Sequence, residues 1–98
     1  MRRIVWRDGI ELPHDPNESE IYRWDWSDWL DGEVLSGTPQ ILADAGITAA
    51  LYFLGTDYVD VRVSGGTVGT TYGVTVRATS DVRARVGDRT VRFTVLER

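Results

Sequence analysis

The chain has 98 residues, of which 42% are hydrophobic and 27% charged, and its formal net charge is −4. This composition is typical of one globular domain and excludes a disordered chain. The absence of cysteine excludes disulfides and thiolate chemistry, and the negative net charge argues against nucleic-acid binding. No apolar run is long enough for a membrane span or a signal peptide, so we expect neither.

Residues 1–19 are predicted to form an N-terminal arm and linker, and residues 20–98 a single domain. The arm carries the apolar tripeptide Ile4, Val5 and Trp6, which we expect to dock either on its own domain or on a neighbouring subunit. Residues 11–20 combine two prolines with several acids, which predicts a solvated linker. The only histidine, His14, is expected to be solvated within it.

Three of the four tryptophans lie in residues 22–30, YRWDWSDWL. Alternation with period two predicts a strand that places Tyr22, Trp24 and Trp26 on one face. We expect these three side chains in the core, because each buried aromatic removes about 150–250 Å² from water. Two alternatives remain open at this point: an aromatic platform for sugar rings, and an anchor for a protein partner.

A single helical turn is predicted over residues 27–32, with Ser27 as its cap and Gly32 as its end. Trp29 lies in this turn, outside the strand alternation, and is expected to be partly exposed or to cover the end of the domain.

Asp25, Asp28 and Asp31 recur every third residue, a spacing that could imitate a calcium loop. Tryptophans intervene, however, and the glycine and terminal glutamate of an EF-hand do not match. A single histidine cannot supply a Ser-His-Asp relay or a multi-histidine metal site within one chain. We therefore expect no catalytic residue, metal or cofactor.

The middle of the chain indicates three extended segments. Residues 33–43 are interrupted by Gly37 and Pro39, which favours a bulged or edge strand. Residues 47–54, ITAALYFL, form a continuous apolar run that favours a buried strand, with a short helix as the alternative. Residues 57–64 alternate as a half-buried strand that ends at a Gly-Gly pair.

The C-terminal third predicts a long hairpin over residues 72–96 with arginines on one face. Residues 70–80, 82–86 and 89–98 each alternate with period two, and Gly87-Asp88 could form the turn. The inward side chains include Tyr72, Val74 and Phe93. Tyr72 also stands where β-sandwiches place a tyrosine whose hydroxyl ties a loop to the start of a strand.

About seven short strands, turn signals between them and no long amphipathic helix predict an all-β fold. We expect a single immunoglobulin-like antiparallel β-sandwich with an N-terminal arm.

Two segments resemble a known family. Residues 25–33, DWSDWLDGE, and residues 61–80, VRVSGGTVGTTYGVTVRATS, are similar to small virion proteins of tailed bacteriophages described as fibre-tail adaptor proteins. The shared positions are the pairs at 25–26 and 29–30, the Ser-Gly-Gly-Thr at 64–67, and Gly69, Thr70 and Tyr72.

The resemblance implies a non-enzymatic structural subunit of the virion, assembled in the host cytoplasm. Its implied partners are other phage structural proteins and further copies of itself, with no nucleic acid and no membrane span. A capsid decoration protein and a carbohydrate-binding module for host attachment are the alternative functions.

Charge is distributed unevenly, because residues 1–61 hold four arginines and twelve acids whereas residues 62–98 hold seven arginines and three acids. One hypothesis is that the acidic linker and tryptophan turn of one copy meet the arginine face of a neighbour. The alternative is that these charges pair within one chain or face solvent. The predicted interface residues are Ile4, Val5, Trp6, Trp29, Arg77, Arg83, Arg85 and Arg92.

Overall fold

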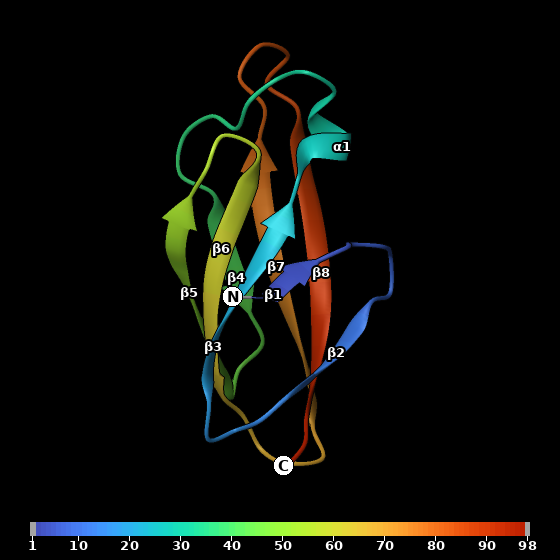
Figure 1. Cartoon of the computed structure of the whole chain (residues 1–98), viewed down its shortest axis with the longest axis vertical. Helices are drawn as coiled ribbons and strands as arrows, with labels where there is room; N and C mark the ends of the chain where they lie inside the picture. The colour runs from blue at the N-terminus through green and yellow to red at the C-terminus, as the bar shows by residue number, and fades with distance from the viewer. Residues whose placement is uncertain (1, 98) are drawn as a thin grey trace.

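The computed structural model describes residues 2–97 and has two β-sheets packed face to face (Figure 1). One sheet has the strand order β1-β3-β6-β5 and the other β2-β8-β7-β4. The strands are β1 Arg2–Ile4, β2 Glu11–His14, β3 Ser19–Asp25, β4 Gln40–Ala43, β5 Ile47–Leu54, β6 Tyr58–Gly65, β7 Thr71–Thr79 and β8 Val86–Val95, and the one helical turn among the described residues is α1 Ser27–Leu30.

The predicted all-β sandwich is confirmed, with two differences. The described part of the chain has eight strands instead of about seven. The pairs β1–β3 and β2–β8 are parallel, whereas the other strand pairs are antiparallel. No helix within residues 2–97 is long and apolar enough to cross a membrane.

The core lies between the two sheets and is built by the alternation of β3, β6, β7 and β8. The six side chains predicted for it are all buried: Tyr22, Trp24, Trp26, Tyr72, Val74 and Phe93. Tyr72 also accepts a hydrogen bond at its hydroxyl from the Thr67 backbone N–H (3.0 Å), which ties the loop after β6 to the start of β7. The predicted loop tie is therefore present.

The interpretation of residues 11–20 as a solvated linker is wrong. Residues 11–14 form β2, which pairs in parallel with β8, and His14 is 1% exposed instead of solvated. Its ring lies against Tyr22 and Phe93, with the centroids 6.2 Å apart in each case. Pro13 suggested a linker, but β2 is an edge strand, where a missing N–H donor is tolerated.

The hairpin β7–β8 is confirmed, but its turn lies elsewhere. Residues 82–85 are a loop instead of a strand, and Gly87 and Asp88 lie inside β8 instead of at the turn. Ala84 has a left-handed backbone (φ 50°), which breaks the extended run. The cause is Glu33, whose carboxylate accepts the backbone N–H groups of Val82 and Arg83 and holds the loop in this shape.

Residues 47–54 form a strand, as favoured, but the expected burial is wrong. Within β5, Ile47 is the buried residue, and the strand forms an edge of its sheet. The pairing with β6 shifts register between Leu51 and Phe53, which leaves Tyr52 as the extra residue of a β-bulge.

The helical turn α1 is confirmed, but Ser27 is not its cap. The N-cap position is Trp26, and no side chain caps it. The Ser27 backbone N–H and hydroxyl instead donate to Asp25 Oδ1, at 2.9 and 2.7 Å. At the other end, Asp31 is already left-handed (φ 50°) before Gly32 (φ 87°).

Candidate functional site

The four tryptophans converge on residues 87–90 of β8. Trp24 Nε1 donates to the Arg89 carbonyl (3.1 Å), and Trp6 Nε1 donates to the Thr90 carbonyl (3.0 Å). Trp29 lies over Gly87, where an added Cβ would stand 2.8 Å from the indole ring. The tryptophans thus organise one short segment of β8.

Arg89 is the centre of this arrangement. Its guanidinium carbon lies 4.8 Å from the ring centroids of both Trp6 and Trp26, so the cation is stacked against two indoles. The same guanidinium donates to both carboxylate oxygens of Asp28 (3.0 and 3.1 Å) and to the Asp25 carbonyl (2.9 Å). We call Trp6, Trp26, Asp28 and Arg89 the Arg89 cluster.

The charges of the Arg89 cluster pair with each other. Arg89 is 7% exposed, although Asp28 remains largely exposed. The hydrogen bonds from Arg89 hold the pKa of the Asp28 carboxyl below its usual value. The N-terminal segment is anchored here, because Trp6 packs on Arg89 from outside the sandwich.

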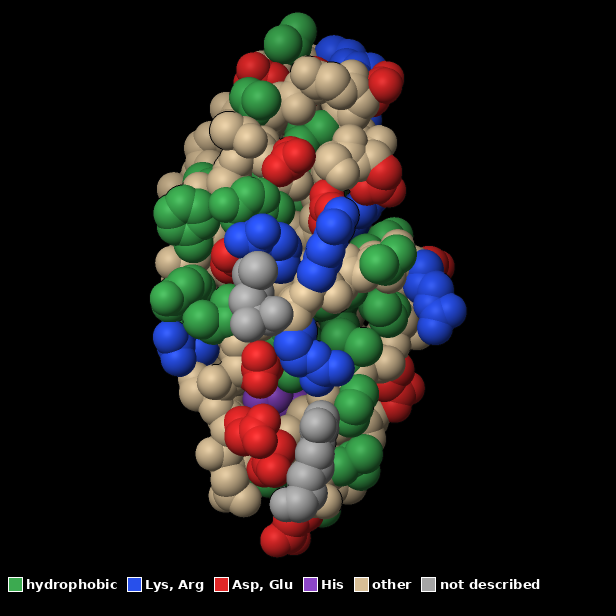
Figure 2. All heavy atoms as spheres, viewed as in Figure 1, with side chains coloured by type: hydrophobic (Ala, Val, Ile, Leu, Met, Phe, Trp, Pro, Cys, Tyr) green, Lys and Arg blue, Asp and Glu red, His purple; other side chains and the backbone are tan. Residues whose placement is uncertain are grey.

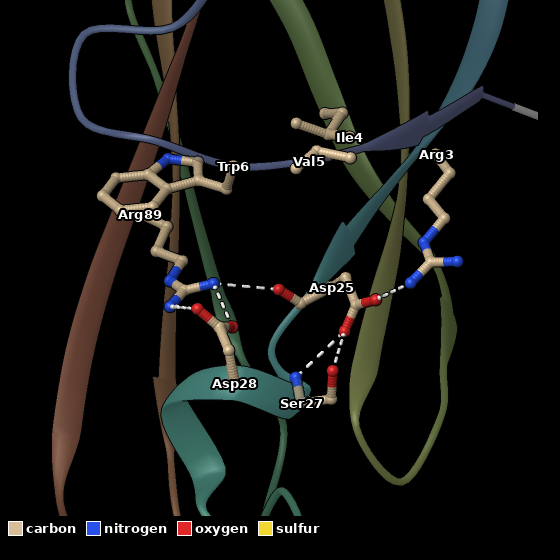
Figure 3. Close-up of a pocket in the computed structure, with 8 residues that line it drawn as sticks. All are labelled: Arg3, Ile4, Val5, Trp6, Asp25, Ser27, Asp28 and Arg89. Carbon is tan, nitrogen blue, oxygen red and sulfur yellow. Dashed lines mark hydrogen bonds and ion pairs between the residues drawn. The ribbon is translucent and has the colours of Figure 1, made fainter.

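A small cavity of about 240 Å³ opens beside the Arg89 cluster (Figure 3). It is lined by Arg3, Ile4, Val5, Trp6, Asp25, Ser27, Asp28 and Arg89. Burial tends to raise the pKa of the Asp25 carboxyl, but hydrogen bonds from Ser27 and Arg3 outweigh it and lower that pKa. The cavity is below the roughly 300–1,000 Å³ of typical small-molecule sites.

Within residues 2–97 no three His, Cys, Asp or Glu side chains are grouped as metal ligands. The calcium-like spacing of Asp25, Asp28 and Asp31 therefore does not correspond to a cluster. Asp25 and Asp28 bind Arg3 and Arg89, and Asp31 lies 4.0 Å from Arg83.

A second charged group closes the end of the sandwich near α1. Glu33 binds Arg83 and Arg85 through its Oε2, at 2.5 and 3.3 Å. The backbone N–H of Arg83, together with its side chain, lowers the pKa of Glu33 to about 2. Arg85 also lies over the Trp29 ring (4.5 Å) and donates to the carbonyls of Trp29 and Leu30.

The apolar tripeptide of the arm docks on its own chain. Ile4 is buried, Trp6 is half-buried against Arg89, and Val5 is exposed. Trp29 is half-buried at the sandwich end, as expected, with its ring edge-on to Trp26 (centroids 5.1 Å apart).

The predicted arginine face is largely neutralised within the chain. Arg77 forms a two-bond ion pair with Asp88 (2.8 and 3.0 Å), and Arg83 and Arg85 share Glu33. Arg92 is exposed on β8. The alternative in which charges pair within one chain thus describes three of the four arginines. An interface role for the predicted residues stays a prediction.

Sequence reasoning missed Arg89 and the exposed part of β5. Arg89 is in phase with Val91, Phe93 and Val95, so the alternation that identified the core could have indicated that its side chain starts on the same face. The sugar-platform alternative is wrong for Tyr22, Trp24 and Trp26, because all three are buried and offer no ring face to a ligand.

These observations define a small all-β sandwich domain whose aromatic and arginine side chains largely stabilise the domain itself. Residues 14–94 match the model of the family Gp77, described as podophage GP4 fiber-tail adaptor protein gp77. The chain therefore belongs to this family of phage fibre-tail adaptor proteins, and it is a structural component of the virion. No match was found among the curated proteins with which the sequence was compared.

Proposed function

We propose that this chain is a non-enzymatic subunit of the phage tail that connects fibre to other tail components through oligomeric contacts. The observation that carries the proposal is the family match over residues 14–94, which extends from the end of β2 almost to the end of β8. We further propose that the subunit assembles with other virion proteins in the host cytoplasm.

The structure supports a role in protein contacts in one specific way. The tryptophans and most of the arginines are used inside the domain, so a partner would meet a preformed surface. A rigid sandwich with internally paired charges loses little conformational entropy on binding, which favours assembly into a repeated structure. The sugar-binding alternative loses its predicted platform, because Tyr22, Trp24 and Trp26 are all buried.

We also propose that the sandwich is immunoglobulin-like. The strand orders support this: if β3, β6 and β5 are taken as strands B, E and D, then β4, β7 and β8 correspond to C, F and G. β2 would then be the half of a divided strand A that pairs in parallel with G, whereas β1 takes the place beside B but runs parallel to it.

The direct test is to remove the gene from the phage and restore it with an epitope-tagged copy. We expect particles without the protein to lack fibres and restored particles to carry the tag where fibre meets tail, as located by electron microscopy. A tag distributed over the capsid would instead indicate a decoration protein. Fibres attached normally in its absence would overturn the proposal.

A further inference from the structure

One lateral side of the sandwich exposes a group of large apolar side chains. There β5 and β4 are the edge strands of the two sheets, and they lie next to each other. Four large hydrophobic side chains on these strands are exposed: Leu42 (37%), Leu51 (39%), Tyr52 (55%) and Phe53 (53%). Figure 2 has hydrophobic side chains gathered along the edge where Figure 1 places β5. We call this surface the β5 edge.

Charge sets this edge apart from the others. From residue 37 to residue 56 the sequence has one charged side chain, Asp44, and its carboxylate is bound to the Gly73 backbone N–H (2.8 Å). On the opposite side, β1 carries two exposed arginines, and β2 carries an exposed glutamate and a proline. Short length, charge, proline and β-bulges are the features that protect sheet edges from pairing. Of these, β5 has only the bulge at Tyr52, and at eight residues it is the longest edge strand among the described residues.

The bulge in β5 turns two aromatic rings onto the outer face of its sheet. Tyr52 lies under the Arg62 guanidinium (5.1 Å), and Phe53 stacks on Tyr58 (centroids 6.1 Å apart). Tyr58 is in turn covered by Arg23 (3.7 Å). The exposed aromatics are therefore held in place on β6 and β3, and ordering them on binding costs little.

The distribution of side-chain size along β5 indicates what would cover this edge. Its first half after Ile47 is small, Thr48, Ala49 and Ala50, and its second half, residues 51–54, is large. In an antiparallel pair of identical strands, the large half of each strand lies against the small half of the other. The pairing is self-complementary under a two-fold axis, as an isologous contact requires. β5 itself has no charged side chain, so the two paired strands place no like charges directly against each other.

We propose that β5 pairs antiparallel with β5 of a second copy of this chain, which joins two four-stranded sheets into one across a two-fold axis near Ala50 and Leu51. Leu42 of β4 adds apolar contact beside the paired strands. The proposal rests on the proposed function, because it names the surface and the partner of one of its oligomeric contacts.

The test compares purified full-length variants by sedimentation equilibrium. Lysine at a strand edge opposes pairing, and two symmetry-related lysines would also repel each other. We expect the unmodified chain to form a dimer, and Ala50→Lys and Phe53→Lys each to raise the dimer Kd by about tenfold or more. Val82→Lys is the matched control, because Val82 is 78% exposed in the loop between β7 and β8 and should leave the Kd unchanged. Circular dichroism checks that each variant keeps its strand content.

A second measurement locates the axis. The sequence has no cysteine, so single substitutions Ala50→Cys and Val82→Cys allow one spin label per chain. The two labels of a dimer should lie closer together at position 50 than at position 82.

Three results would overturn the proposal: an unmodified chain that stays monomeric at every soluble concentration, a dimer that survives both lysine substitutions, or labels at position 50 that lie farther apart than those at 82. Lysine variants that still enter particles and attach fibres would leave the adaptor role standing without this contact. Lysine variants that still dimerise when purified, but whose particles lose their fibres, would contradict the β5 pairing and not the adaptor role.

Discussion

The two lateral sides of the sandwich use the same kinds of side chain in opposite ways. On the β1 and β2 side, Trp6 covers Arg89, and the charges of Asp25 and Asp28 are paired with arginines. On the β4 and β5 side, Tyr52 and Phe53 project from a strand that has no charged side chain of its own. Stacked arginine–aromatic pairs occur on both sides. What differs is whether a further segment of the chain covers them.

The N-terminal segment closes one side of the molecule. β1 and β2 add one strand to each sheet at this side, and Trp6 lies between them in the sequence. Among the described residues, no strand of this chain covers β5 in the same way. The closed side should therefore determine the stability of the monomer, and the open side should determine its association.

The largest effect is expected from Arg89→Ala on the closed side. The variant loses two cation–π contacts and three hydrogen bonds, and we expect its free energy of unfolding to fall by about 3 kcal/mol. The exposure of Asp28 keeps the loss from being greater, because its carboxylate can return to water. The pKa of Asp28 should rise toward its ordinary value of 3.8, which NMR titration can follow. Arg92→Ala, at an exposed site on the same strand, serves as the control and should change little. An equal loss in both variants would contradict the role given to Arg89.

Trp6→Ala should have the next largest effect. It removes a half-buried indole, its hydrogen bond to Thr90 and its contact with Arg89, for about 2 kcal/mol. Amide hydrogen exchange should become faster in β1 and β2, while β6 and β7 stay protected. Val5→Ala, at a neighbouring exposed side chain, should leave stability within about 0.5 kcal/mol. Unchanged exchange in β1 and β2 of the Trp6 variant would show that these strands hold without this anchor.

Glu33→Gln tests the loop junction at the sandwich end, with a smaller effect that depends on pH. The folded-state pKa of Glu33 is about 2, below its ordinary 4.5, so its ionised form stabilises the fold. This contribution is complete above about pH 4.5 and is lost as the pH falls toward 2. The urea midpoint of the unmodified protein should therefore exceed that of the variant near pH 6, and the two should converge near pH 2. Glu18→Gln, at an exposed position, is the control; a gap that persists at pH 2 would refute the prediction.

The smallest effect on monomer stability is expected on the open side. Ala50→Lys lies at an exposed position of β5 directly opposite Arg62, and the two like charges should lower the free energy of unfolding of the monomer by no more than about 1 kcal/mol. Chemical denaturation at a protein concentration too low for association measures this value. A large loss would mean that the β5 edge contributes to the monomer itself, and the contrast between the two sides would fail.

Much of the core could be predicted, because strand alternation is a local property. Val74 and Phe93 are inside since every second residue of a strand points to the same face, and this requires no knowledge of the neighbouring strand. The same logic placed Tyr22, Trp24 and Trp26 correctly. The β7–β8 hairpin could be predicted because its two alternating segments lie close together in the sequence.

The errors arose where a distant segment decides the outcome. The sequence of residues 11–14 is typical of a linker, but in the structure these residues pair with β8, and His14 is buried in the core. Residues 82–86 alternate like a strand, but Glu33, about fifty positions earlier, holds residues 82 and 83 in a loop. The apolar run of β5 suggested burial, yet its position at a sheet edge leaves it exposed.

Local patterns along the chain are enough to predict a cysteine-free all-β domain with an aromatic core and an uneven distribution of charge. Only the folded arrangement shows that the N-terminal segment completes both sheets, that Arg89 lies against both Trp6 and Trp26, and that β5 is left at an open edge. The physical reason is the separation along the sequence of the residues that interact. Backbone geometry sets the alternation of side chains within a few residues, whereas the neighbours of an edge strand or of a buried cation come from segments tens of residues away.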